Sequence, residues 1–307
     1  MAVFISTLNQ MVFMFLFMLL GYLLKNKNLL PDDAGSAISK LENLVFMPCL
    51  VLNTFIGRCT IRNLIDKLPF LLYGCASLAI AIALAAWLTH YFTRNKNQKG
   101  IYRYSLTVAN IAFMGNAVVE GVFGEEILFD YLIFTLPINL FLNSIGISWL
   151  MPSSEDTPFW RKLLGPVNIS SIIGVALGIT AIPIPKALLT TISAGSACMA
   201  PMAMLLTGFI IGEYSLKFLL SLKKIYLVSI YRLALMPLLF AGLAWLFPIA
   251  PDVQHVLICA YSMPLGLNAI VIPAAYGGDT TLGAGMALIS NVLALFTIPA
   301  SFYFLIA

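Results

Sequence analysis

The stretch "ANIAFMGNAVVEGVFG" (residues 109–124) places Gly115 and Asn116 in the middle of a long apolar run. A second apolar run, "SMPLGLNAIVIP" (residues 262–273), carries a proline, a glycine and an asparagine in the same way. Proline removes a backbone donor and glycine costs roughly 1 kcal/mol relative to alanine inside a helix, so both are natural break points. Backbone groups that a break frees inside a membrane must be buried in protein or line a watery cavity. We therefore expect an interrupted helix in each run, at a functional site.

The composition is that of an integral membrane protein, because 61% of the 307 residues are hydrophobic and only 10% are charged. A helix needs about 20 apolar residues to cross a hydrocarbon core of about 30 Å. Continuous runs of that length favour helices over the alternating strands of a membrane barrel. The first basic residue, Lys25, follows a full-length apolar run, so this run is not a cleavable signal peptide. We predict an all-α membrane protein with ten transmembrane helices, numbered here as spans 1 to 10: 3–25, 36–57, 67–93, 102–124, 127–150, 164–183, 187–212, 225–247, 253–276 and 281–305.

The loops between these spans are short and leave no room for a water-soluble domain. Lys and Arg residues are concentrated in the odd-numbered loops and their flanks, and few lie on the other side. By the positive-inside rule the odd-numbered loops are cytoplasmic, which places both termini on the extracytoplasmic side of the cell membrane. The net charge of +4 reflects this topology and gives no support to a nucleic-acid partner. The lipid bilayer is the expected surrounding.

The two halves of the chain, residues 1–150 and 151–307, agree when the sequence is shifted against itself by about 152 positions. Asn116 then falls on Asn268, and glycine and proline positions agree at nearly the same offset. Each half holds five spans, and this odd number forces the second copy to enter the membrane from the opposite side. An inverted repeat with helices interrupted at matching positions is the sequence pattern of a secondary transporter whose site lies near the midplane.

If spans 4 and 9 break near their centres and cross, the second half of each helix points its N-terminus toward the middle of the membrane. Helix N-termini carry partial positive charge and free N–H groups, so two that converge form a site for an anion. The amides of Asn116 and Asn268 would add hydrogen bonds. The alternative is that Gly115 and Gly266 only allow close packing, as small residues do in many membrane bundles.

Four motifs, in chain order, resemble those of the auxin efflux carrier superfamily in its prokaryotic branch, which is related to the plant PIN exporters. They are "LLGYLLKNKNLL" (19–30), "KLENLVFMPCLVLNTF" (40–55), "NIAFMGNAV" (110–118) and "YSMPLGLNAIVIPAAYGGD" (261–279). The similarity covers nearly the whole chain, and the last motif is the most specific. One departure is Ala117, where the family usually has proline, and it bears on how sharply span 4 is broken.

The resemblance implies a fold like that of the sodium/proton antiporters and bile-acid symporters, with a 5+5 inverted repeat and crossed, broken spans 4 and 9. Spans 1, 2, 6 and 7 would form a scaffold, with a homodimer through spans 2 and 7. Spans 3–5 and 8–10 would form a moving transport domain. Relatives carry carboxylates such as malate and malonate in bacteria and indole-acetate in plants. Such cargo agrees with the anion site derived from the two helix N-termini.

The residues assigned to substrate binding lie at the two breaks. The resemblance implies contacts from Asn110, Asn116, Pro264 and Asn268, and Gly115 opens the same stretch. Polar residues of spans 2, 5 and 10 are weaker candidates, because such residues are as often hydrogen-bond partners between helices as ligands. They are Asn53, Asn139, Asn143, Ser290 and Asn291.

Ionisable groups within a bilayer are expensive, so each is a functional hypothesis. Glu120, near the outer end of span 4, is a candidate for proton coupling, and an interfacial carboxylate is the alternative. Arg232, about two turns into span 8, is deep enough to attract an anion and long enough to reach the interface. Lys40 and Glu42 open span 2 and are expected to form a solvated boundary pair. The crossed region holds no aspartate pair, which argues against a sodium/proton antiporter that depends on one.

The sequence gives no support to an enzyme, a cofactor or a metal site. Its histidines, His90 and His255, lie near span ends, and neither an HExxH nor a GxxxxGK[ST] pattern is present. The glycine pairs in "GVALG" (174–178) and "GFIIG" (208–212) suit close helix packing and a dimer seam.

We predict a secondary active transporter that works by alternating access and carries small organic anions, such as malate-like acids or auxin-like compounds. Coupling to protons is preferred, because no sodium cage is evident in the sequence. The alternatives are a sodium-coupled organic-anion symporter of the bile-acid type and an anion channel. A carrier shows saturation and counterflow, and a channel shows neither.

Overall fold

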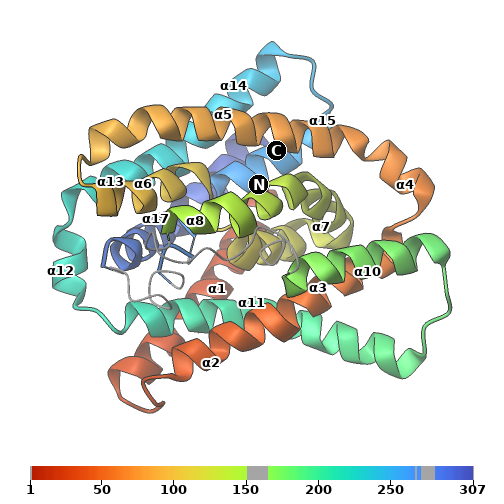
Figure 1. Ribbon diagram of the computed structural model, residues 1–307, viewed down its shortest axis with the longest axis horizontal. Coiled ribbons are helices and arrows are strands. Elements are labelled where there is room, and N and C mark those ends of the chain that lie inside the picture. Colours follow the sequence, from red (N-terminus) through yellow and green to blue (C-terminus); the bar gives the residue numbers. More distant parts are fainter. Residues whose placement is uncertain (1, 151–164, 267, 271–280, 307) are drawn as a thin grey trace.

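The structure is a computed structural model that describes residues 2–150, 165–266, 268–270 and 281–306, and these residues are almost wholly helical (Figure 1). Among them, seven helices are long and apolar enough to cross a membrane, and an eighth apolar helix, Pro166–Thr180, is shorter. The seven are Val3–Asn26, Ala34–Arg58, Ile61–Phe92, Ile111–Leu150, Lys186–Ile211, Lys223–Leu246 and Thr281–Leu305. The chain is an all-α, multi-pass membrane protein.

The first side of the molecule is built by α1 (Ala2–Asn26), α2 (Ala34–Leu41), α3 (Met47–Arg58), α10 (Pro166–Thr180) and α11 (Lys186–Ile211). Helix α1 packs against α11, and α3 packs against both α10 and α11. The glycine pairs of α10 and of the α11 end make these contacts. A Cβ atom at Gly208 would collide with the Met18 carbonyl of α1, and one at Gly178 would collide with Cys59 at the end of α3. These glycines therefore serve packing inside the chain.

The opposite side is built by α4 (Ile61–Asp66), α5 (Leu68–Phe92), α6 (Lys96–Thr107) and α8 (Ile147–Leu150), with α7 (Asn116–Phe141) running between the two sides (Figure 1). Helix α5 packs against both α6 and α7. Gly124 divides α7 in two, because its φ of 82° and ψ of −179° are not helical. Only glycine adopts this conformation without strain.

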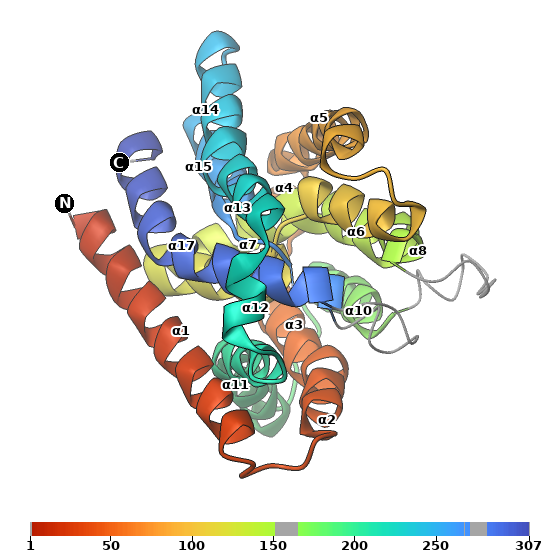
Figure 2. The ribbon, with the colours of Figure 1, turned by 90° about the vertical axis from the view of Figure 1, so that its left-hand side faces the viewer.

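The rest of the chain forms α12 (Leu216–Ser221), α13 (Lys223–Ile230), α14 (Met236–Leu246), α15 (Pro251–Ser262) and α17 (Thr281–Leu305). Figure 2 shows α14 and α15 together on one side, α11 on the other, and α7 and α17 between them. Helices α1 and α17 also pack together, and the rings of Phe4 and Tyr303 lie 6.0 Å apart. The two ends of the chain therefore lie side by side (Figure 2).

Short π-helical turns interrupt several of these helices, and two of them come just before a proline. The turn η1 (Glu42–Phe46) precedes Pro48, and the turn η4 (Tyr231–Leu235) precedes Pro237. Proline has no N–H to donate and its ring crowds the preceding turn, so a wider turn relieves the conflict. Each of these two turns carries a buried charged residue, Glu42 in η1 and Arg232 in η4. Such turns are frequent at functional sites.

Candidate functional site

The two apolar runs that the sequence marks for interruption are both interrupted, and the interruptions meet. Helix α6 ends at Thr107, and the next helical turn, the π-turn η2 (Ile111–Gly115), leads into α7. Helix α15 ends at Ser262, and the chain stays non-helical from Met263 to Gly266. Ala109 and Leu265 form an isolated antiparallel bridge, and the Asn110 N–H donates to the Pro264 carbonyl over 2.8 Å. Two segments far apart in the sequence are thus joined through their backbones.

The break in span 4 does not lie at Gly115 and Asn116, as the sequence suggested, but at residues 108–110. Gly115 is helical, with φ −61° and ψ −48°. A Cβ atom there would collide with the hydroxyl of Tyr131, which donates to the Ile111 carbonyl over 3.1 Å. Gly115 is therefore needed for close packing, which was the alternative explanation. Ala117, at the family's proline position, is part of α7.

A small cavity, called here the interface cavity, lies between α3 and α10 on one side and η2 and α7 on the other. Its free volume is about 20 Å³, enough for about one water molecule. It brings together two candidates of the sequence analysis, Asn116 and Asn139, with Ala112 from the first turn of η2. The complete lining is Met47, Val51, Phe55, Ala112, Asn116, Leu132, Leu136, Asn139, Val167, Asn168 and Ser171. The first turn of η2 and amide side chains from both sides of the cavity thus contribute to its lining.

Asn116 touches the opposite side of the cavity directly, because its Nδ2 donates to Met47 Sδ of α3 over 3.6 Å. Asn168 and Ser171 of α10 line the same cavity and were missed by sequence reasoning. Their spacing of three residues puts them on one face of a helix, and this was a usable signal.

The other assigned residues serve the junction or lie apart from the cavity. Asn110 is buried, its backbone is bonded at the junction, and its side-chain nitrogen has no hydrogen-bond partner among the described residues. Ser290 Oγ accepts a hydrogen bond from the Leu265 N–H over 3.1 Å and so holds the span 9 interruption. Asn291 Nδ2 donates to the Ala287 carbonyl of its own helix over 2.8 Å.

Three more candidates lie outside the lining of the interface cavity. Asn268 is helical and half-buried, on the far side of the span 9 interruption. Asn53 is half-buried on α3, and Glu120 is half-buried on α7, one turn before the Gly124 kink. Asn143 falls in the π-turn η3 (Leu142–Gly146), and its side chain is outside the described residues.

Arg232 does not reach toward the membrane interface, because its side chain is only 1% exposed. Its Nη1 donates to the Thr107 carbonyl over 3.4 Å, and its guanidinium carbon lies 5.2 Å from the centroid of the Tyr261 ring. Thr107 is the last residue of α6, and Tyr261 lies in the last turn of α15. Among the described residues, no carboxylate forms an ion pair with Arg232. The guanidinium thus stands where the two interrupted segments leave their first helices.

The expectation of a solvated Lys40–Glu42 pair is wrong. Lys40 is exposed, but Glu42 is completely buried, and neither of its carboxylate oxygens has a hydrogen-bond partner in the described part of the chain. The reason is that Glu42 continues the buried stripe of α2, which packs against α11. The Met47 N–H bonds to the Glu42 carbonyl across the wide turn, so Glu42 lies one turn from the residue that touches Asn116.

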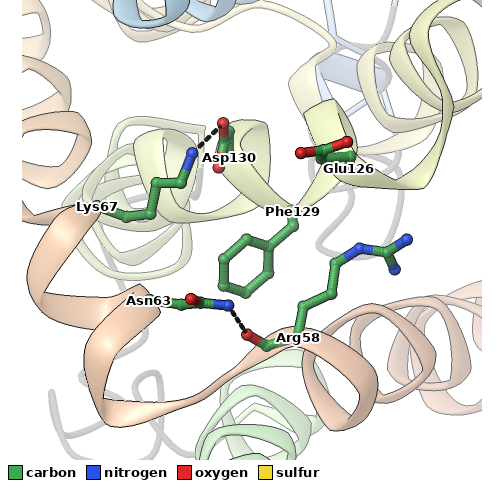
Figure 3. A pocket seen from close by; sticks show the side chains of 6 residues that line it. All are labelled: Arg58, Asn63, Lys67, Glu126, Phe129 and Asp130. Atoms are coloured by element: carbon green, nitrogen blue, oxygen red, sulfur yellow. Dashed lines mark hydrogen bonds and ion pairs between the residues drawn. The ribbon is translucent and has the colours of Figure 1, made fainter.

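A second pocket, called here the side pocket, has a free volume of about 250 Å³ (Figure 3). It is lined by Arg58, Asn63, Lys67, Glu126, Phe129 and Asp130. Figure 3 shows Lys67 turned toward Asp130, to which its Nζ lies at 2.6 Å. Arg58 is paired with Glu125 at 2.9 Å. Both cations of the lining are therefore engaged by carboxylates, and the pocket offers an anion no unpaired positive charge from the described residues.

No group of three or more His, Cys, Asp or Glu side chains that could hold a metal ion occurs in the described ranges. The five cysteines are free thiols, two of them buried. The chemistry available at the junction is therefore that of amide groups, backbone N–H and carbonyl groups, tyrosine hydroxyls and one guanidinium. Groups of these kinds can donate and accept hydrogen bonds.

Comparison with known proteins agrees with a transport role. The model of the family described as "Membrane transport protein" matches residues 6–157 and 154–302. An uncharacterized transporter of Methanothermobacter thermautotrophicus is 23% identical over 303 residues, which cover 97% of this chain and 98% of the relative. An uncharacterized transporter of Methanocaldococcus jannaschii is 24% identical over 301 residues, which cover 95% and 96%. The chain belongs to the membrane transport protein family, that is, to the auxin efflux carrier family that its motifs resemble.

Proposed function

We propose that the protein is a secondary carrier for small carboxylates that works by alternating access around the junction of the two interrupted helices. The observation that carries this proposal is the hydrogen bond from the Asn110 N–H to the Pro264 carbonyl. Non-helical backbone at membrane depth is tolerated only where protein buries it or a cavity meets it. Two such stretches that pair with each other are the pattern of a carrier whose site lies near the midplane.

A ten-span, 5+5 arrangement fits the helices described here. Gly124 divides the long apolar run Ile111–Leu150 into spans 4 and 5, and α10 provides span 6. Helices α6 and α15, each of 12 residues, provide the first halves of spans 4 and 9. At a rise of 1.5 Å per residue each is roughly 18 Å long, about half of a membrane crossing. The adjacent chain ends also agree with an even number of spans.

The interface cavity is where we place the substrate. It separates α3 and α10, which would belong to the scaffold, from η2 and α7, which would belong to the transport domain. Its small volume corresponds to a closed state, and a relative movement of the two sides would open it. The start of η2 and the amide of Asn116 offer N–H donors to a carboxylate, whereas its remaining walls are largely apolar. The homodimer through spans 2 and 7 stays a prediction.

The test is uptake of labelled malate, malonate or indole-acetate into proteoliposomes, after a thermal-shift screen has shown which carboxylate binds. Saturable uptake with counterflow is expected, and Asn116→Ala and Asn139→Ala, both in the lining of the interface cavity, should abolish it while expression and melting temperature stay near those of the wild type. Asn43→Ala is the matched control, because this exposed amide bonds only within its own helix. Wild-type transport in both variants would refute the site, and conductance without saturation would support a channel instead.

A further inference from the structure

We propose that Arg232 is a resident cation that takes the place of a coupling sodium ion at the junction, so that transport does not require sodium. This inference rests on the proposed carrier function. In carriers with broken helices, the carbonyl-bearing ends of the half-helices coordinate the coupling ion. Here that position is filled by a side chain of the protein itself.

Arg232 donates a hydrogen bond to a carbonyl at the end of a helix. Its Nη1 donates to the Thr107 carbonyl at the end of α6. The last carbonyls of a helix have no intrahelical partner and carry partial negative charge. The hydroxyl of Thr107 donates to the Arg103 carbonyl one turn earlier, so it does not compete for the Thr107 carbonyl. The guanidinium therefore occupies a place that is electrostatically suited to a cation.

Arg232 also contacts the end of α15. Tyr261 lies one residue before the end of α15, and the guanidinium lies over its ring at 5.2 Å. Arg232 thus contacts the ends of both first half-helices, which no other basic residue does among the contacts of the described chain. A cation over an aromatic face is stabilised further when it is removed from water.

None of the described residues acts as a counterion of Arg232. Arg232 is buried, it forms no ion pair within the described residues, and its Nε has no hydrogen-bond partner. A buried charge without compensation costs several kcal/mol. Its guanidinium stays protonated in proteins, so it cannot become neutral. The helix ends and the ring are what compensate it, and they are the same groups that would otherwise attract a mobile cation.

Arg232 does not line the cavity in which we place the substrate. Ile111 and Tyr131, which are bonded to each other, are the sequence neighbours of the lining residues Ala112 and Leu132. Arg232 is therefore a positioning residue. It holds the junction in place, and the substrate lies on the other side of the junction.

The experiment measures initial rates of malate uptake into proteoliposomes at fixed pH, with external sodium or choline. Wild-type protein should transport equally in both. Arg232→Lys should keep sodium-independent uptake because it keeps the charge. Arg232→Gln should lose about tenfold or more, the size expected for a lost hydrogen bond to a charged group, and guanidinium ion at millimolar concentration should restore part of the rate. Arg62→Gln, at a side chain that is 92% exposed, is the matched control.

Wild-type uptake that needs sodium would overturn the proposal, and so would full sodium-independent activity of Arg232→Gln. A second readout does not depend on transport. Millimolar guanidinium should raise the melting temperature of purified Arg232→Gln and leave that of the wild type unchanged. If the wild type transports no carboxylate, the proposed function fails, whereas the melting experiment still decides whether a cation belongs at this position. Equal guanidinium responses of variant and wild type would show that it does not. If Arg232→Gln does not fold, the comparison of sodium and choline in the wild type and in Arg232→Lys decides.

Discussion

Gly115→Ala should destabilise the protein, and Tyr131→Phe should partly rescue it. A Cβ atom at position 115 would overlap the Tyr131 hydroxyl and lie 3.0 Å from the ring carbon that bears it. Overpacking of this kind costs about 1–3 kcal/mol, which outweighs the roughly 1 kcal/mol that alanine gains over glycine in a helix. Tyr131→Phe alone should cost about 1 kcal/mol, because the Ile111 carbonyl loses its donor.

The double variant should be more stable than the sum of the two single effects by about 1 kcal/mol or more, because phenylalanine removes the atom that collides. Rescue should stay incomplete, since the ring carbon remains close. Free energies of unfolding from denaturant titration in detergent micelles give the cycle. Gly242→Ala in α14 is the control, because nothing lies within 4 Å of its Cβ position, and it should be neutral or stabilising. Strict additivity of the two substitutions would refute the packing role of Gly115.

Three further changes test the junction and its surroundings. Ser290→Ala should lower the free energy of unfolding by about 1–3 kcal/mol, because the buried Leu265 N–H loses its acceptor, and hydrogen exchange at that amide should quicken. Glu42→Leu should raise the melting temperature, since it removes two buried oxygens that have no partner; a lower value would contradict the unpaired burial. Lys67→Met should cost about 2 kcal/mol by leaving the nearly buried Asp130 carboxylate unpaired, and adding Asp130→Asn should recover most of the loss, whereas no recovery would count against the pair.

The sequence indicated which runs are interrupted, but not where the interruption in span 4 lies. Glycine, proline and asparagine act locally on the backbone, so their presence in two apolar runs was visible without a structure. The role of Gly115 is different because it depends on Tyr131, a residue 16 positions later in the sequence. The sequence does not distinguish a glycine needed for tertiary packing from a glycine needed for a helix break.

The structural roles of Arg232 and Glu42 were likewise predictable only in part. The depth of Arg232 in an apolar run indicates that it is buried. The direction in which its side chain points is not predictable from the sequence, because it depends on the wide turn before Pro237 and on the approach of α6. The position of Glu42 beside Lys40 at the start of span 2 favours a solvated pair, whereas its actual burial depends on packing against α11. Periodicity counted from the buried residues Gly35 and Ile38 would have put Glu42 on the inner face.

On the proposed function, the positions of the helix ends would place a cation and a bound anion on opposite sides of the junction. The first half-helices α6 and α15 end at the junction, where Arg232 meets their negative ends. The helical segment that follows, η2, starts at the junction, and its first turn contributes to the lining of the interface cavity. The bond between Asn110 and Pro264 joins the two interrupted segments, so a movement of one must carry the other. On the proposed mechanism, the junction slides along the surfaces that α3 and α10 present to the cavity. The guanidinium of Arg232 then moves with the junction rather than with the substrate.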